Sequence, residues 1–133
     1  MSPALSPELA HLVALAREAQ KRAYAPYSHF LVGAALQTRS GKVFSGCNVE
    51  NASYGASICA ERNAVLQMVA AGELELARLA VYSDASEPAT PCGTCRQVLS
   101  EFGRDVEIVC AGPEATRLLT LDALFPQPFR LSP

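Results

Sequence analysis

The sequence predicts an α/β fold in which helices cover a central sheet, and three observations support this. The chain has 133 residues, the length of one domain, and half of them are hydrophobic, which allows a packed core. Segments with helical spacing of apolar residues alternate with short strand-like runs. Such alternation is typical of layered α/β folds with crossover connections.

The first helix is expected to begin after Ser6, since residues 6–8 combine an N-cap, a proline at the first helical position and an acid in the first turn. Apolar residues then recur at helical spacing: Leu9, Leu12, Val13 and Ala16. Pro26 ends this helix. Residues 30–36 and 42–48 flank a turn with Gly41 and predict a β-hairpin. The small residues 33–35 predict a strand that packs closely against a neighbour.

After a polar loop at 48–57, residues 59–71 predict a second helix that ends at Gly72. Its apolar face is expected to consist of Ile58, Val65, Leu66 and Val69. The remaining elements are expected as a strand at 79–82, a helix at 92–102, a strand at 106–110, a short strand at 117–119 and a short helix from 120. From residue 125 the prolines favour an extended tail.

Charge and composition exclude several classes of function. The chain has 11 Lys and Arg against 13 Asp and Glu, so we expect a small substrate and no nucleic-acid partner. We expect no membrane partner, since no apolar run approaches the roughly 20 residues of a membrane span. Residues 1–10 have no pattern of a signal peptide, which favours a cytoplasmic protein. Five cysteines in such a chain indicate thiols or metal ligands.

Cys59, Cys92 and Cys95 have the spacing of a metal site. Three protein ligands leave the fourth position of a zinc ion open, which is typical of a catalytic site. Cys59 and Cys92 both fall at predicted helix starts, where the helix dipole favours thiolates. We therefore expect one zinc ion per chain.

Glu61 lies two residues after Cys59 and is placed to move protons. Zinc lowers the pKa of bound water toward ~7. Glu61 would take that proton, hydroxide would attack a ring carbon of amidine type, and Glu61 would return protons to the ring nitrogen and the leaving amine. Arg62 is a plausible partner for the ligand sulfurs.

Other interpretations of these cysteines remain open. Cys92 and Cys95 alone could form a redox pair at a helix start. A structural zinc site would need a fourth ligand, and the candidates are Cys47, Cys110, His11 and His29. We expect these four to be two buried strand residues, a residue on a helix face and a structural or exposed histidine, respectively. A non-catalytic zinc protein would not need Glu61.

Four segments together carry a resemblance to a known family: PYSHFLVGAA at 26–35, GCNVENASY at 46–54, ICAER at 58–62 and PCGTCRQ at 91–97. They resemble the small, homotetrameric, zinc-dependent cytidine deaminases, whose metal motif is shared by other zinc deaminases. The resemblance runs from about residue 19 to residue 129. Leu31, Ser57 and Phe125 depart from the usual family residues, away from the catalytic atoms.

This resemblance implies a three-layer α/β/α fold with a mixed sheet of about five strands, in a single catalytic domain over residues 1–133. It implies hydrolytic deamination of cytidine and 2′-deoxycytidine to uridine and 2′-deoxyuridine in pyrimidine salvage, by zinc-hydroxide attack on C4 with Glu61 as the proton shuttle. The expected partners are a pyrimidine nucleoside, water and three further copies of the chain. A deaminase of another aminated heterocycle is the alternative.

The resemblance also implies roles for single residues. Phe30 would stack on the pyrimidine, Asn48 and Glu50 would bind ribose hydroxyls, the Ala60 N–H would meet the C2 carbonyl, Glu61 would meet N3 and the amine, and Tyr54 and Phe129 would reach a neighbouring subunit's site. A carboxylate at Glu50 accepts hydrogen bonds from hydroxyls but repels phosphate, which favours nucleosides over nucleotides. The alternative is that Asn48 and Glu50 only shape a turn.

Overall fold

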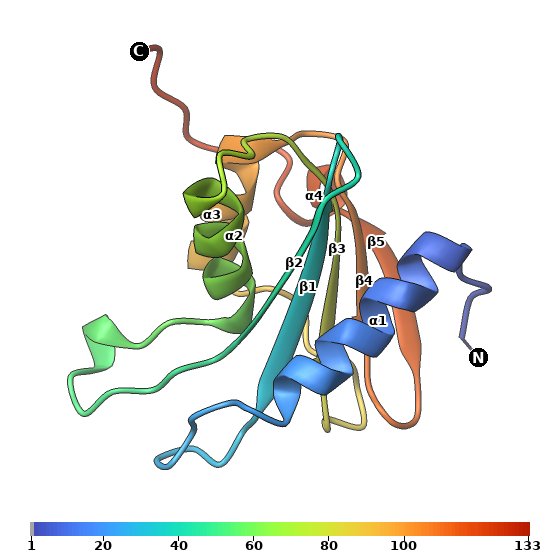
Figure 1. Cartoon of the computed structure of the whole chain (residues 1–133), viewed down its shortest axis with the longest axis vertical. Helices are drawn as coiled ribbons and strands as arrows, with labels where there is room; N and C mark the ends of the chain where they lie inside the picture. Colours follow the sequence, from blue (N-terminus) through green and yellow to red (C-terminus); the bar gives the residue numbers. More distant parts are fainter. Residues whose placement is uncertain (1) are drawn as a thin grey trace.

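The computed structural model describes residues 2–133 and contains a five-stranded sheet in the order β2-β1-β3-β4-β5 (Figure 1). The strands are β1 Val32–Thr38, β2 Val43–Cys47, β3 Leu76–Ser83, β4 Glu107–Ala111 and β5 Thr116–Thr120. β3 and β4 are parallel, and the other neighbouring strands are antiparallel. The predicted mixed sheet is therefore confirmed.

Helices cover both faces of this sheet. They are α1 Pro7–Gln20, α2 Ala60–Ala70, α3 Gly93–Phe102 and α4 Leu121–Leu124, with a short 3₁₀ turn, η1, at Tyr54–Ala56. α1 crosses one face, while α2 and α3 lie side by side on the other (Figure 1). Each face has its own buried apolar cluster, so the three-layer α/β/α arrangement is confirmed.

Side chains cap α1 and α4, which begin where the sequence predicts. Ser6 is the N-cap of α1, and its Oγ accepts a hydrogen bond from Leu9 N over 3.2 Å. Thr120 Oγ1 accepts one from Ala123 N over 3.2 Å at the start of α4. Gly41 has a φ of 96° in the turn between β1 and β2, as the hairpin prediction requires.

Two glycines allow the helices to approach the strands. A Cβ at Gly33 would collide with the carbonyl oxygen of Ala16 in α1. A Cβ at Gly46 would lie 2.7 Å from Ala64 N in α2, on the other face. The predicted close packing of the 33–35 strand is therefore confirmed, and it comes from α1.

β1 begins at Val32, two residues later than the predicted strand at 30–36. His29 has a φ of 58°, which turns the chain immediately before this segment. Phe30 N donates to Ser28 Oγ, and Phe30 O accepts from Asn48 Nδ2. Side chains thus take the backbone groups that a strand would have paired.

The buried face of α2 differs from the predicted one. Leu66 and Val69 are 57% and 37% exposed, whereas the buried residues of α2 are Ala60, Glu61, Ala64, Val65 and Met68. The small residues Ala60 and Ala64 let the helix approach β1 and β2 closely, and this contact outweighs the burial of larger side chains on the other face. The expected face was therefore wrong except for Val65.

Within residues 2–133, every helix is too short or too polar to cross a membrane.

Candidate active site

The three cysteines expected to bind zinc lie together where two helices begin. Cys59 is the N-cap of α2, Cys92 is the N-cap of α3, and Cys95 lies in the first turn of α3. Their Sγ atoms all lie within 4.8 Å of one another. The two predicted helix starts are therefore confirmed, with Cys59 and Cys92 at the capping positions.

These distances fit one zinc ion held by three thiolates. Zn–S bonds of about 2.3 Å at tetrahedral angles put two sulfurs about 3.8 Å apart. The Sγ atoms of Cys59 and Cys92 are 3.9 Å apart, far beyond the ~2.05 Å of a disulfide bond. Among residues 2–133, no fourth cysteine, histidine or carboxylate joins the group. The donor set thus leaves a coordination position for water or substrate, as catalytic zinc sites do.

The four candidates for a fourth ligand lie outside this group. Cys110 is buried in β4, as expected, whereas Cys47 ends β2 and is only half-buried. His11 on α1 and His29 before β1 are exposed. The geometry therefore gives no support to a four-ligand structural zinc site.

Hydrogen bonds within the cluster favour the thiolate form of Cys59. A hydrogen bond from Cys95 lowers the pKa of Cys59 to about 5, against the opposing effect of burial, and Arg62 and Cys92 add to the lowering. The same bond, together with burial, raises the pKa of Cys95. Arg62 Nη2 donates to Cys59 Sγ over 3.5 Å and to Ser57 O over 3.3 Å. The cluster thus carries negative charge at neutral pH, which attracts a metal cation.

Arg62 has a further donor available. Its Nε is buried and has no hydrogen-bond partner among the described residues. A guanidinium has five N–H donors in a fixed geometry, so this atom is a donor left for a ligand sulfur. Such bonds withdraw charge from thiolates and restore Lewis acidity to a zinc ion with three anionic ligands.

Glu61 is a buried carboxyl group beside the thiols. It lies in the first turn of α2 and is 5% exposed. Burial raises the pKa of Glu61 to about 7, and the charge on Cys59 adds to this effect, whereas its own backbone N–H and Arg62 lower the pKa. A carboxyl group with a pKa near 7 can both accept and donate protons at neutral pH.

One cavity of about 200 Å³ opens onto Glu61 and the thiols. Its lining residues are Phe30, Val32, Asn48, Cys59, Ala60, Glu61, Val81, Ala89, Thr90 and Cys92. The structure thus brings Phe30, Asn48 and Ala60, three of the expected substrate contacts, to the same space as Glu61. The walls are mainly apolar, which suits a planar ring.

Comparison with known protein families identifies the chain. Residues 7–111 match the family model described as the cytidine and deoxycytidylate deaminase zinc-binding region. The chain belongs to this deaminase family. Together with the three-thiol group, the match makes it a zinc-binding hydrolase of the cytidine deaminase type.

Individual relatives agree with this assignment. The chain is 48% identical over 108 residues to a probable cytidine deaminase of Dictyostelium discoideum. The aligned region covers 80% of this chain and 73% of the relative. It is 46% identical over 91 residues to a cytidine deaminase of Sporosarcina psychrophila, and the aligned region covers 68% of this chain and 67% of that relative. The crystal structure of cytidine deaminase from Burkholderia pseudomallei has a TM-score of 0.87 at 44% identity and covers 94% of this chain and 100% of that one.

In this deaminase, Asn48 and Glu50 both hold the segment before β1. Asn48 Oδ1 accepts from Val32 N, and Asn48 Nδ2 donates to Phe30 O, each over 2.8 Å. Glu50 Oε1 accepts from the N–H groups of Tyr27 and Ser28 over 3.0 and 3.1 Å, and Oε2 accepts from Ser28 Oγ. The Ser28 hydroxyl is the main cause that lowers the pKa of Glu50. The two residues therefore hold the turn at residues 27–32. Ribose binding by Asn48 and Glu50 stays a prediction.

Glu50 and Tyr54 line a second cavity of about 290 Å³, whose other lining residues are Tyr27, Ser28, Asn51 and Ser57. Tyr54 is 85% exposed. Phe129 is 68% exposed and lies outside the cavity with Glu61. Neither aromatic ring therefore contacts the thiol cavity of its own chain, and their role at a neighbouring subunit stays a prediction.

Sequence reasoning missed Ser28, Val32 and Val81 in the deaminase. Ser28 lies within the segment 26–35 that carries the family resemblance, but nothing in its spacing indicates a contact with Glu50. Val32 on β1 and Val81 on β3 line the cavity because they lie on the same face of the sheet. In the strand pairing, Val32 is opposite Ser83 and Val81 is opposite Ala34, so the two valines are diagonal neighbours. Only the strand pairing reveals this.

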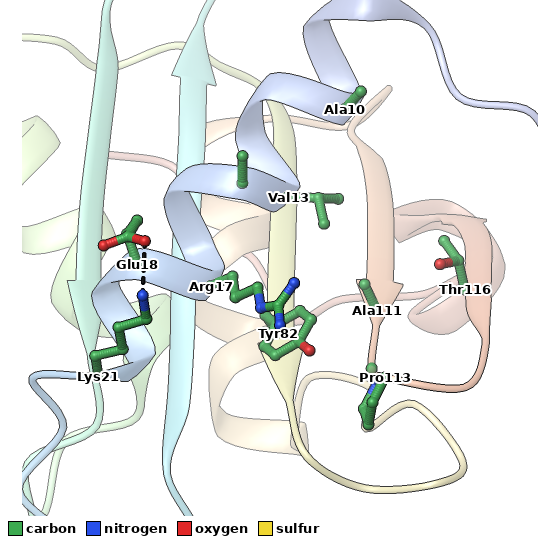
Figure 2. Close-up of a pocket in the computed structure, with 11 residues that line it drawn as sticks. Ala10, Val13, Arg17, Glu18, Lys21, Tyr82, Ala111, Pro113 and Thr116 are labelled. Carbon is green, nitrogen blue, oxygen red and sulfur yellow. Dashed lines mark hydrogen bonds and ion pairs between the residues drawn. The ribbon is translucent and has the colours of Figure 1, made fainter.

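A cavity larger than the one with Glu61 lies away from these groups. Figure 2 shows this space of about 730 Å³ beside α1, where Arg17 lies over the Tyr82 ring with 5.6 Å to its centroid. It is on the α1 face of the sheet and contains none of the expected site residues. Size alone would therefore have pointed to the wrong face.

Replacing Cys92 with alanine is expected to remove zinc, because only two of the three thiolate ligands would remain. Elemental mass spectrometry of the purified variant measures the amount of zinc per chain and tests this expectation. Cys47→Ala is the matched control and should keep one zinc per chain. Unchanged zinc in Cys92→Ala would refute the assigned ligand set.

Proposed function

We propose that the protein catalyses hydrolytic deamination of cytidine and 2′-deoxycytidine to uridine and 2′-deoxyuridine, as one catalytic domain over residues 1–133. The observation that carries this proposal is the position of buried Glu61 beside three metal-binding thiols in one cavity with Phe30 and Asn48. Relatives named cytidine deaminases support the choice of substrate. The reaction is one of pyrimidine salvage, and we propose a cytoplasmic enzyme.

Cys59, Cys92 and Cys95 would hold the zinc ion. When bound, zinc supplies Lewis acidity that makes water a nucleophile near neutral pH. Arg62 hydrogen-bonds Cys59 and so withdraws negative charge from the ligand sulfurs.

Glu61 moves the protons. It accepts a proton from the attacking water and delivers it to ring N3, while the water oxygen adds to C4. It then carries the second proton of that water to the amine, which leaves as ammonia when the C4–N bond breaks. One carboxylate can serve both steps because they occur in sequence, and its pKa near 7 suits both directions of transfer.

The cavity walls would orient the base. Phe30 would stack on the pyrimidine ring. The Ala60 N–H lies at the first position of α2, where helix N–H groups have no intrahelical partner, and it would donate to the C2 carbonyl.

Asn48 and Glu50 would bind the ribose hydroxyls in addition to holding the 27–32 segment. An oxygen of a carboxylate or amide has two lone pairs. Glu50 Oε1 already accepts two hydrogen bonds, but Glu50 Oε2 and Asn48 Oδ1 each accept one and have a lone pair left. The negative charge of Glu50 would repel a 5′-phosphate and so select nucleosides.

We propose that the enzyme is a homotetramer whose active sites are shared between subunits. The support is the exposure of two large aromatic side chains, Tyr54 and Phe129, that lie outside their own cavity. Burying such a side chain fully is worth roughly 1.5–3 kcal/mol, which favours a partner surface. Phe129 would then close a neighbouring subunit's site over the base.

Glu61→Gln is expected to lower kcat by about 10²–10⁴-fold, because glutamine keeps the shape but cannot accept a proton. Steady-state kinetics with cytidine check this, with zinc content measured in parallel. Glu73→Gln makes the same chemical change near the Gly72 turn, away from the site, and should leave kcat unchanged. A Glu61→Gln enzyme within tenfold of the wild type would contradict the proton-transfer role.

Cytidine should be a much better substrate than cytidine 5′-monophosphate. The carboxylate of Glu50 would repel the phosphate, so a preference of at least about 10²-fold in kcat/KM is expected. Glu50→Gln should narrow this preference, since it removes the charge and keeps an acceptor for Tyr27 and Ser28. Efficient turnover of the monophosphate by the wild type would mean that Glu50 does not face the 5′ end.

Phe129→Ala is expected to raise KM by about 3- to 10-fold through the loss of an aromatic contact, with zinc retained. Leu131→Ala removes another exposed apolar side chain from the same tail and should leave KM unchanged. Light scattering at assay concentrations gives the oligomeric state. A fully active monomer would eliminate shared active sites, while the zinc chemistry would stand.

A further inference from the structure

The C-terminal segment, residues 121–130, lies along α3. Three hydrogen bonds between side chains and backbone hold it there. Arg96 Nη1 donates to Leu124 O over 2.8 Å, and Gln97 Nε2 donates to Phe129 O over 3.0 Å. In return, Arg130 Nη1 donates to Ser100 O over 2.9 Å. The segment therefore has a defined position although residues 125–133 contain no helix or strand.

Arg96 also binds the two residues that precede Cys92 at the start of α3. Its Nε donates to Pro91 O over 2.7 Å, and its Nη2 donates to Thr90 Oγ1 over 3.2 Å. Thr90 and Pro91 directly precede Cys92, and Thr90 lines the cavity with Glu61. One guanidinium thus joins the segment that carries a zinc ligand to the last turn of α4.

Apart from the packing of the buried residues Pro88 and Pro91, few polar contacts hold the segment before Cys92. Residues 84–91 contain no helix or strand, and in the described chain their only hydrogen bonds to other residues are the two from Arg96. Cys92 itself is exposed and has no side-chain capping bond. Cys92 O accepts from the backbone N–H of Arg96 over 2.9 Å. The residues directly before Cys92 therefore depend on the Arg96 side chain for their hydrogen bonds.

We propose that Arg96 is a positioning residue that couples zinc binding at Cys92 to the docking of the C-terminal segment 121–130. Bound zinc would fix Cys92 and the residues before it. Arg96 hydrogen-bonds both those residues and Leu124 O, so a fixed Cys92 also fixes the end of α4. Gln97, on the same helix α3, then hydrogen-bonds Phe129 O. Because coupling between two binding equilibria is reciprocal, the docked segment also strengthens zinc binding. The inference rests on the zinc site and not on the deamination reaction.

Arginine is suited to this position because its planar fork reaches three acceptors at once, which a lysine ammonium on a flexible stem does not reproduce. The simpler alternative is that Arg96 only satisfies the terminal carbonyl of α4, as helix C-termini require. On that alternative, replacing Arg96 would cost stability but would leave zinc affinity unchanged. Zinc affinity therefore separates the two roles.

The control is an arginine elsewhere that also donates three hydrogen bonds, although to two partner residues instead of three. Arg78 donates to Gln37 Oε1 over 2.8 Å and to Glu107 Oε1 from two nitrogens over 3.3 and 3.4 Å. It lies on β3, opposite Gln37 and Glu107 of the neighbouring strands, and contacts neither the thiol group nor the C-terminal segment. Arg96→Lys and Arg78→Lys thus make the same chemical change in comparable networks.

The first measurement is the rate of zinc transfer from the zinc-loaded protein to the dye 4-(2-pyridylazo)resorcinol. Arg96→Lys should release zinc about tenfold faster than the wild type, the low end of the effect of outer-shell changes. Arg78→Lys should release it at the wild-type rate. Equal release from the two variants would overturn the proposal, whereas a wild type without zinc would instead refute the zinc site.

The second measurement follows the wild type with and without zinc and adds Arg96→Lys as a comparison. Deuterium uptake of peptides from residues 121–133 is followed by mass spectrometry in zinc-loaded wild type and after zinc removal with EDTA. Zinc removal should increase uptake in these peptides, and Arg96→Lys should show high uptake with or without zinc. Uptake that does not respond to zinc in the wild type would overturn the coupling.

Discussion

Two helix N-termini must meet at one point for the three thiols to hold a metal ion, and the chain connections around β3 make them meet. α2 leads through a short turn into β3 and therefore runs opposite to it, so α2 begins beside the C-terminal end of that strand. α3 begins after β3 and residues 84–91, at the same edge of the sheet. β3, α3 and the parallel strand β4 form a crossover unit, and such units place ligands at the carboxyl ends of their strands.

Charge is balanced closely in this small space. A carboxyl group beside anionic sulfurs is disfavoured as a carboxylate, and burial adds to that effect, so Glu61 becomes a group that titrates near neutral pH. Arg62 and the two helix ends compensate the thiolates. The same features that stabilise a metal cation thus adjust the one carboxyl group that can exchange protons with a substrate.

The sequence was sufficient for element order, helix caps and the thiol group, because these depend on local spacing and on residues with one dominant role, such as Ser6, Gly41 and Cys92. It failed for the buried face of α2, where contact between backbones at Gly46 and Ala64 decided the rotation of the helix. It also could not separate two uses of one side chain. Asn48 and Glu50 hold the segment before β1, and only the hydrogen bonds reveal this. Arg96 gave no signal because two of its acceptors lie in the irregular segment before α3, and only the fold brings the third, Leu124 O, close to it.

The central claim is that the three-thiol zinc site with Glu61 deaminates a cytosine nucleoside. The most direct test follows the ultraviolet absorbance of cytidine with the zinc-loaded protein, with the protein after EDTA treatment, and after zinc is restored, with ammonia measured at the end. The account predicts conversion to uridine with one ammonia per nucleoside, loss of conversion without zinc and recovery when zinc returns. Unchanged cytidine with the zinc-loaded protein, or an equal rate after zinc removal, would contradict it.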